Sequence, residues 1–576
     1  MWNWMPGKGI TVILFVLFSA AAFWLMESYE HNPFREVRPK AQMFNLLLFE
    51  LAALAMYLLT NGMRLAIRVE LAAAMVFGLV NHYVMLFRST PFVPCDLLSI
   101  KTAATVTDNY DFTPGPRVVI VTLGFVLLFI LAHFLKNAPR PIFWFRFPMA
   151  LLAVSVISTF AGRLQDEAFQ VKHYLYPYLF TPAYMTKVNG MAVTFVMNLQ
   201  YLQIGQPKGY HREEAKELLA SYEEEAAKPG GYPNIIVIMD EAFSELAVLA
   251  ELKTNVDYMP FFHELQQGAE HTVTGYAQVS VCGGNTANSE FEFLTGHTMA
   301  FLPNGSIPYQ QYINGEIPSL ASHLAELGYQ TLAQHPYYAS GWERDEVYPR
   351  LGFDQADFID GYWDRSYVRN YISDACDFAH VIRTYEEKEP GRPAFIFNVT
   401  MQNHGGYTEE YENFTEEVEA EGGSAALNRY LSLLKLTDES LRVLIRYFAE
   451  AEEPTVIVFF GDHQPNDFVV RPVWRTNGID SSNLTGEQQR MRYQVPFLIW
   501  ANYDIPEGTG VHTSLNYLAG YVLELAGVPK SAYQNYLSGL QEHYPVISAA
   551  ELMDTGTEEL LTYQRLQYYQ LFDYDE

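Results

Sequence analysis

Two glycines and several small polar residues interrupt an apolar-rich region in the sequence Val279-Ser280-Val281-Cys282-Gly283-Gly284-Asn285-Thr286-Ala287-Asn288-Ser289-Glu290-Phe291-Glu292-Phe293. A run of this kind presents side chains to a site rather than to a core. Taken alone, it is more typical of an ordinary turn that leads into a helix. Partners elsewhere in the chain have to decide between these two interpretations.

Long apolar segments dominate the N-terminal part of the 576-residue chain. Segments of this length are about long enough to cross the hydrocarbon core of a membrane. No small-residue cleavage site follows the first one, so we expect an anchor rather than a signal peptide. Arg68 and Glu70 weaken the third segment as a span, because charges are costly inside a bilayer. The five predicted spans are Ile10–Met26, Met43–Leu59, Leu65–Phe87, Val118–Leu135 and Phe145–Ala161.

The orientation of these spans decides on which side the rest of the chain lies. The two sets of short loops contain equal numbers of basic residues. One set includes a cluster at Lys136–Arg146, between the last two spans. Basic loops stay in the cytoplasm, so this cluster favours a cytoplasmic N-terminus. With five spans, everything after Ala161 is then expected outside the cytoplasm.

Charge and cysteine content exclude several classes of function. The formal net charge is −29, which argues against a nucleic-acid partner. The three cysteines, Cys95, Cys282 and Cys376, are too widely separated for a metal knuckle or a disulfide framework.

Changes in composition divide the chain into four expected parts. Within the second part, Thr181–Leu202 is predicted to form an amphipathic helix on the membrane surface, and Arg212–Lys228 a solvated helix that Pro229-Gly230-Gly231 ends. In the last part, Leu560–Phe572 is expected to be helical and to pack on the preceding domain. The four parts are a transmembrane domain of five helices (1–162), a juxtamembrane linker (163–231), an α/β catalytic domain (232–548) and an acidic, tyrosine-rich tail (549–576).

Short β-branched and aromatic runs, separated by helical stretches, indicate an α/β domain after Asn234. The clearest runs are Ile235–Met239, Ala394–Val399, Thr455–Phe460 and Pro496–Trp500. The first three runs are followed, in order, by Asp240-Glu241, Asn403-His404 and Asp462-His463. Open α/β sheets place their sites at the carboxyl ends of parallel strands, so we expect these side chains to converge.

Carboxylates and an imidazole suit a divalent ion such as Mn²⁺, Mg²⁺ or Zn²⁺. Individually, Asp462-His463 is more often a capped turn, and Glu241 a carboxylate at a helix start. If they converge, the Thr286 hydroxyl can complete the shell, and a bound metal would make that hydroxyl a nucleophile.

With this combination the sequence resembles the lipoteichoic acid synthase family, membrane-anchored members of the alkaline phosphatase and sulfatase superfamily. The resemblance extends from the predicted spans to about Trp500, and its most specific portion comprises Thr286–Phe291, Phe293–Gly296 and Met299–Tyr309. It implies an N-terminal five-helix transmembrane bundle followed by an α/β sulfatase-like domain on the extracellular side of a bacterial cell membrane.

The resemblance also implies a set of site residues. Thr286 corresponds to the catalytic threonine, and the single ion is expected to be Mn²⁺, with Mg²⁺ as the alternative. Its ligands would be Glu241, Thr286, Asp462 and His463, and the substrate headgroup pocket would comprise His335, Trp342, Arg344 and His404. Arg344 can form two parallel hydrogen bonds to a phosphate, the histidines can move protons and Trp342 can line one side of the glycerol site. Each of these four residues also has a purely structural interpretation, such as a satisfied histidine or an arginine paired with a neighbouring carboxylate.

Two departures from the family pattern leave the acceptor and headgroup preference open: His404-Gly405-Gly406-Tyr407 forms a looser loop than the family's histidine, proline and aromatic, and His335 is followed by Pro336-Tyr337-Tyr338. Separately, Cys282 lacks the Pro and Arg of a sulfatase nucleophile motif, so we interpret it as a small residue approaching Thr286. Ser289 and Glu290 are expected at the helix start, supporting Thr286.

The implied function is transfer of glycerol phosphate from phosphatidylglycerol, through a threonine-linked intermediate, to a glycerol-terminated or glycolipid acceptor. This is polymer synthesis of the lipoteichoic acid type. Phosphoethanolamine transfer and sulfate-ester hydrolysis are alternatives that use the same metal centre. A headgroup-binding sensor and a transporter are alternatives of another class, although no polar spacing across the spans suggests a substrate path.

Overall fold

The computed structural model describes residues 8–88, 91–97, 112–135, 143–176, 182–202, 204–222, 231–303, 305–363, 365–481, 483–551 and 556–574. The chain divides into two compact units. The first comprises Met1–Leu97, Phe112–Gln203 and Pro303–Gly305, and the second Leu98–Asp111, Ile204–Leu302 and Ser306–Glu576. The predictions for Lys136–Arg140 and for Glu223–Gly230 lie outside the described residues.

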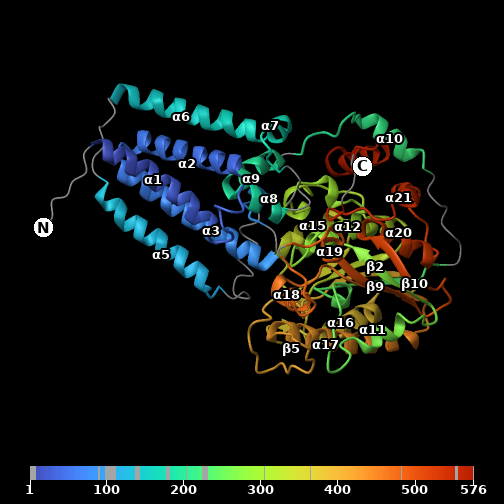
Figure 1. The fold of residues 1–576 in the computed structure, drawn as a ribbon. Helices are drawn as coiled ribbons and strands as arrows, with labels where there is room; N and C mark the ends of the chain where they lie inside the picture. The colour runs from blue at the N-terminus through green and yellow to red at the C-terminus, as the bar shows by residue number, and fades with distance from the viewer. Residues whose placement is uncertain are drawn as a thin grey trace. The chain divides into compact units, whose positions relative to one another are not determined.

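Each predicted span is a helix of the first unit, and these helices lie side by side (Figure 1). They are α1 (Lys8–Glu27), α2 (Pro39–Thr60), α3 (Met63–Arg88), α5 (Pro116–Leu131) and α6 (Phe143–Leu164). Among the described residues, three helical stretches are long and apolar enough to cross a membrane: Gly9–Glu27, Pro39–Thr60 and Trp144–Leu164. The helices are therefore confirmed, whereas the count of five spans stays a prediction.

The single amphipathic helix predicted over Thr181–Leu202 is wrong. The segment forms α8 (Pro182–Asn189), α9 (Met191–Asn198) and a short 3₁₀ turn, because Gly190 adopts a left-handed φ of 82° and ends the first helix. A side chain at Gly190 would collide with Asn45 of α2, whose Nδ2 donates to the Asn189 carbonyl at 2.7 Å. Val193 and Met197 pack with residues of α2 in one apolar cluster. The apolar face of α9 is thus covered within the first unit.

An eight-stranded mixed sheet forms the centre of the second unit. Its order is β10-β2-β9-β8-β1-β7-β3-β4, and all four predicted runs are strands of it. The central strands β7, β1 and β8 are parallel, whereas β9 is antiparallel to both of its neighbours. The strands are β1 (Asn234–Asp240), β2 (Thr272–Gln278), β3 (Gln330–Gln334), β4 (Gln355–Asp357), β7 (Ala394–Val399), β8 (Thr455–Gly461), β9 (Gln494–Ala501) and β10 (Gly508–Ser514).

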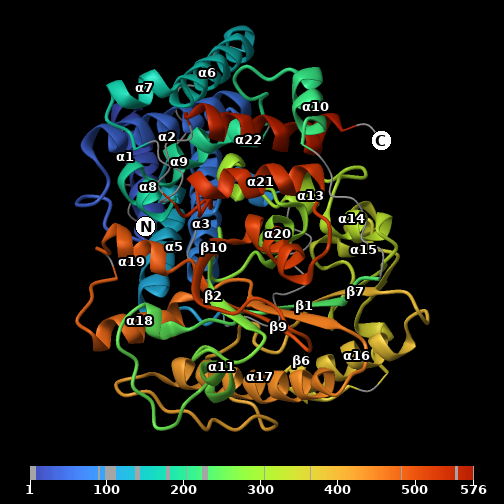
Figure 2. The ribbon, with the colours of Figure 1, turned by 90° about the vertical axis from the view of Figure 1, so that its right-hand side faces the viewer.

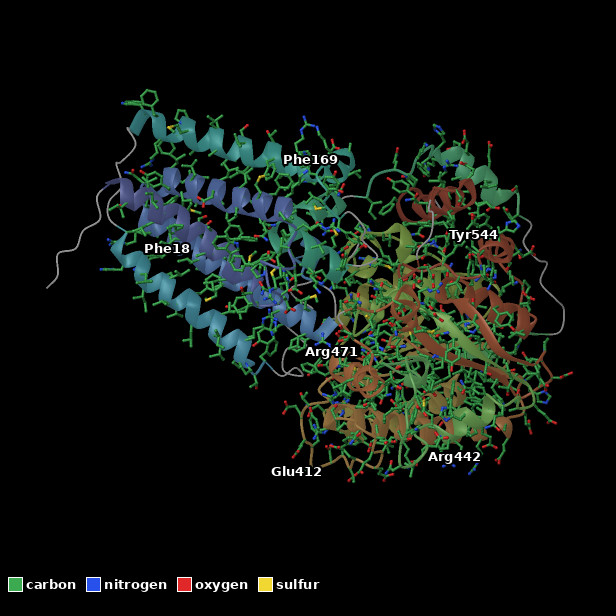
Figure 3. The ribbon with its side chains drawn as sticks, in the orientation of Figure 1. Phe18, Phe169, Glu412, Arg442, Arg471 and Tyr544 are labelled. Carbon is green, nitrogen blue, oxygen red and sulfur yellow. The ribbon has the colours of Figure 1, made fainter. Side chains whose placement is uncertain are left out.

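Helices cover both faces of this sheet (Figure 2). Alternate residues of β1 serve the two faces: Val237 belongs to one core and Ile236 to the other, which is why the strand is a continuous apolar run. Exposed charges such as Arg442 of α17 lie on the outer surface (Figure 3). One layer contains α12 (Thr286–Thr295), α14 (Leu320–Glu326) and α20 (Leu515–Ala526), and the other α11 (Pro260–Leu265), α16 (Asp374–Glu387) and α17 (Ala425–Ala449).

The tail is helical and packs on the domain, as predicted. It forms α22 (Glu558–Tyr568), continued by a π-helical turn at Tyr569–Asp573. The Tyr563 hydroxyl donates to the Gly296 carbonyl at 2.7 Å. The Gln567 side chain accepts a hydrogen bond from the Thr298 N–H and donates one to the Thr298 carbonyl. The helix predicted over Arg212–Lys228 is described as α10 (Arg212–Ala220), with Ser221 as its C-cap. These contacts belong to the second unit.

Gly461, the last residue of β8, is the sharpest steric constraint beside the predicted site. A Cβ there would lie 1.8 Å from the Phe243 carbonyl oxygen. We expect Gly461→Ala to destabilise the protein by about 1–3 kcal/mol or more, because the backbone has to move. Denaturant unfolding of the full chain measures this.

Gly539 on α21 (Ala532–His543) is the matched control, since a Cβ there meets nothing within 4 Å. Gly539→Ala should raise the stability by about 0.5–1 kcal/mol. Equal stability of the two variants would contradict the steric interpretation of Gly461.

Candidate metal centre and active site

The ends of β1 and β8 bring two acidic residues together. Asp240 pairs with Gly461 in the register of these strands, so that Glu241 and Asp462 follow side by side. The chain turns sharply after β1 because Ala242 adopts a left-handed φ of 53°, and its N–H donates to Asp462 Oδ1 at 2.7 Å. A strained non-glycine residue at this point holds Glu241 against Asp462.

Glu241, Asp462 and His463 form a cluster that could hold a metal ion, with one ligand atom of each lying within 4.8 Å of the others. His463 Nε2 lies 3.2 Å from Asp462 Oδ2 and 3.7 Å from Glu241 Oε1. Both Asp462 Oδ2 and His463 Nε2 are buried and have no hydrogen-bond partner among the residues that the structure describes. Buried polar atoms that lack protein partners and point at one another fit a divalent cation.

The tautomer of His463 also suits a metal ligand. Its Nδ1 lies 3.0 Å from the Gln464 carbonyl, which can only accept, so Nδ1 carries the proton and Nε2 presents a lone pair. Ser289 Oγ donates to the Asp462 carbonyl at 2.6 Å and fixes the backbone between the two ligands. Ser289 therefore holds the backbone of Asp462 rather than supporting Thr286 directly.

Thr286 is the first residue of α12, which begins three residues before the predicted start at Ser289. Asn285, with a left-handed φ of 69°, turns the chain into the helix, and Gly283 N–H donates to the Gln464 carbonyl at 2.9 Å. The Thr286 hydroxyl donates to Glu241 Oε2 at 3.2 Å. The positive end of the helix dipole favours negative charge here, so it stabilises an alkoxide or a bound phosphate. The structure thus brings all four predicted metal ligands together.

Burial and mutual repulsion shape the electrostatics of this centre. Burial, followed by the charge of Asp462, raises the pKa of Glu241 well above its ordinary value, while Arg344 and Arg369 act in the opposite direction. Burial likewise raises the pKa of Asp462, and the nearby His463 opposes this shift. Two buried carboxyls without a cation are unfavourable when both are ionised, and a divalent ion would relieve this.

The predicted pocket histidines are both held in fixed orientations. His335, at the end of β3, donates from Nδ1 to the Val399 carbonyl at 2.8 Å, and burial lowers its pKa well below its ordinary value. His404 is half-buried, its Nδ1 lies 3.0 Å from the Tyr371 hydroxyl, and burial, then Arg369, lowers its pKa to about 3. Trp342 has a left-handed φ of 57° and packs against the core.

Arg344 is buried and already paired. Its Nη2 lies 2.5 Å from Glu290 Oε1, and its Nε donates to the same carboxylate. Glu290 also accepts a hydrogen bond from the Tyr348 hydroxyl at 2.8 Å. Glu290 therefore anchors Arg344 rather than supporting Thr286 directly, and phosphate binding by Arg344 stays a prediction.

Sequence reasoning placed Asp240 and Asn403 at the strand ends of the site but gave them no role there. Asp240 is fully buried and accepts hydrogen bonds from Thr400 and Asn403. Arg369, in contrast, stands in an unremarkable turn sequence and no local pattern singles it out. Cys282 is buried, and burial raises the pKa of its thiol, as suits a structural residue.

The Glu290–Arg344 pair gives a direct stability test. Glu290→Gln leaves a buried guanidinium without its counter-charge, which should cost about 3–5 kcal/mol. Glu346→Gln is the matched control, since Glu346 pairs with Arg350 at the surface at 3.2 Å and should contribute about 0.5 kcal/mol or less. Denaturant unfolding of both variants checks this, and a similar small effect of both would contradict the role assigned to Glu290.

Comparison with known proteins places this site in a family. A Rhizobium meliloti (strain 1021) protein named for the modification of cyclic β-1,2-glucan is 32% identical over 387 residues, covering 66% of this chain and 58% of the relative. Lipoteichoic acid synthase of Staphylococcus saprophyticus is 27% identical over 239 residues, covering 40% of this chain and 35% of the synthase. The chain thus spans less than two thirds of these relatives' lengths.

Among solved structures, the Streptococcus pyogenes phosphoglycerol transferase GacH has a similar fold. It superposes with a TM-score of 0.50 at 20% identity, over 64% of this chain and 95% of that one. The sequence model of the sulfatase family matches residues 233–528, which include every predicted site residue. These findings confirm the predicted resemblance: the chain belongs to the sulfatase family, in the alkaline phosphatase superfamily, and is related to the lipoteichoic acid synthases.

Proposed function

We propose that this protein is a membrane-anchored, metal-dependent phosphoglycerol transferase whose donor is phosphatidylglycerol. The observation that carries the proposal is the convergence of Thr286, Glu241, Asp462 and His463 at the start of α12. The lipoteichoic acid synthases among the relatives support the glycerol phosphate group. The apolar helices α1, α2 and α6 suit an enzyme whose donor and by-product are both lipids.

The site residues would hold one divalent ion, Mn²⁺ with Mg²⁺ as the alternative, through Glu241, Asp462, His463 and the Thr286 hydroxyl. Such an ion lowers the pKa of a bound hydroxyl and offsets charge on phosphoryl oxygens. The Thr286 hydroxyl is oriented by its hydrogen bond to Glu241 and lies at the positive end of α12, whose dipole favours negative charge at this position.

The reaction would proceed in two displacements at phosphorus. The Thr286 hydroxyl would give up its proton as Oγ attacks the phosphorus of phosphatidylglycerol, the bond to the diacylglycerol oxygen would break, and that oxygen would take up a proton. The glycerophospho group then stays on Thr286 until an acceptor hydroxyl attacks phosphorus and gives up its proton, whereupon the bond to Oγ breaks and Oγ is protonated again. His335 and His404 would move these protons, and Arg344 and Trp342 would contact the headgroup.

Two acceptor classes are supported by different relatives. A glycerol-terminated or glycolipid acceptor corresponds to the lipoteichoic acid synthases, whereas the relative named for cyclic β-1,2-glucan modification supports a glucan. We further propose that the enzyme is integral to a bacterial cell membrane and that residues 232–548 act on its extracellular side. Phosphoethanolamine transfer is the alternative that keeps the same centre.

Headgroup-labelled phosphatidylglycerol and Mn²⁺, incubated with the purified full chain in detergent, test the donor. We expect release of diacylglycerol and labelling of the protein at Thr286. Thr286→Ala should reduce release by about 10³-fold or more, because the nucleophile is lost. Adding a glycerol-terminated glycolipid or a cyclic glucan in parallel identifies the acceptor.

Thr562→Ala on α22 is the matched control, because its hydroxyl only donates to the Glu558 carbonyl at 2.7 Å. It should retain full activity. Turnover of phosphatidylethanolamine or of a sulfate ester, without diacylglycerol release from phosphatidylglycerol, would overturn the proposed donor.

A further inference from the structure

Arg369 stands in the turn between two short strands, β5 (Tyr367–Val368) and β6 (Tyr371–Ile372). Turn residues of a hairpin usually face solvent, yet Arg369 is only 3% exposed. Its backbone also adopts a left-handed φ of 56°, which costs a non-glycine residue about 1 kcal/mol or more. Burial of a cation in a strained turn calls for a specific set of contacts.

Those contacts all go to the loop that follows β7. Arg369 Nη2 donates to the carbonyls of Gln402 and His404, each at 2.6 Å, and Nη1 donates to the Gly405 carbonyl at 3.1 Å. Three charge-assisted hydrogen bonds from one rigid guanidinium fix the path of this loop. The sequence His404-Gly405-Gly406 has little stiffness of its own, so the loop depends on this arginine.

Tyrosine rings complete the attachment. The Arg369 guanidinium lies over the rings of Tyr371 and Tyr407, each at 5.5 Å, and of Tyr411 at 5.8 Å. The hydroxyl of Tyr371 lies 3.0 Å from His404 Nδ1. The same hairpin therefore fixes both the backbone of His404, through Arg369, and its ring, through Tyr371.

The charge of Arg369 is not neutralised by a carboxylate partner. Among the described residues no carboxylate forms an ion pair with it, and its Nε is buried without a hydrogen-bond partner. Arg344, by comparison, is held by Glu290 at 2.5 Å. A buried guanidinium bound only to carbonyls keeps its positive charge close to the site, where a phosphate would be favoured.

From this geometry we infer that Arg369 is a positioning residue: together with Tyr371 it sets the backbone and ring of His404 for contact with the transferred phosphate group. The inference rests on the proposed function for its substrate. It assigns the hairpin β5–β6, which no motif marks, as the support of the headgroup pocket.

Kinetics of Arg369→Lys and Tyr371→Phe with phosphatidylglycerol test the inference. Lysine keeps the charge but has a single nitrogen in place of the planar fork whose two nitrogens reach the three carbonyls, so kcat should fall about 10- to 100-fold with KM changed less than threefold. Tyr371→Phe should give a smaller loss of kcat, since it removes only the contact between the Tyr371 hydroxyl and His404 Nδ1 and leaves the bonds of Arg369 to the backbone intact. A kcat within twofold of the unsubstituted protein for Arg369→Lys would overturn the inference.

Amide hydrogen exchange provides a readout that does not need the reaction. Arg369→Lys should speed exchange in the peptide covering 401–411, but not in α12. Unchanged exchange in 401–411 would also overturn the inference, whereas a full chain that is inactive on phosphatidylglycerol would overturn the proposed function and leave this readout valid.

Arg383→Lys is the matched control. Arg383 on α16 also lies over an aromatic ring, Trp363, at 4.9 Å, but its side chain is 38% exposed and pairs with Glu387 at 2.7 Å. It should change neither kcat nor exchange. If Arg369→Lys lowers Tm by more than about 5 °C, Tyr371→Phe carries the test, and an unchanged kcat for it would count against the inference.

Discussion

The structure of the second unit depends on one electrostatic constraint: Glu241, Asp462 and His463 are buried with their ligand atoms facing one another. Two of those atoms, Asp462 Oδ2 and His463 Nε2, find no hydrogen-bond partner in the described part of the chain. Such a cluster is unfavourable in a protein interior unless a cation joins it. The strained φ of Ala242 and the steric limit at Gly461 show that the backbone is held in place to maintain it.

Surrounding elements serve this cluster from different directions. Glu241 and Asp462 directly follow the parallel strands β1 and β8. Thr286 lies at the positive end of the α12 dipole, and His404 lies in the loop after β7. Ser289 and Glu290 on the same helix then act differently, since one holds the backbone of Asp462 and the other holds Arg344. A short buried helix thus connects the proposed nucleophile, the proposed metal ligands and the proposed headgroup pocket.

Much of this arrangement could be predicted from the sequence, because buried parallel strands appear as continuous apolar runs and their carboxyl ends meet at one edge. That reasoning located β1, β7, β8 and β9 and the convergence of Glu241, Asp462 and His463. It failed where long-range partners decide the outcome. The pairing of Arg344 with Glu290 joins residues 54 positions apart, and Arg369 has no local signal. Gly190 broke a helix because its neighbour, Asn45, comes from another helix.

The central claim is that the buried cluster is a metal site completed by Thr286. Anomalous X-ray diffraction from crystals of the full chain grown with Mn²⁺ tests it most directly. The account predicts one anomalous peak within about 2–2.5 Å of oxygen or nitrogen atoms of Glu241, Asp462, His463 and Thr286. Absence of a peak between these side chains, at Mn²⁺ concentrations that load other sites, would contradict it.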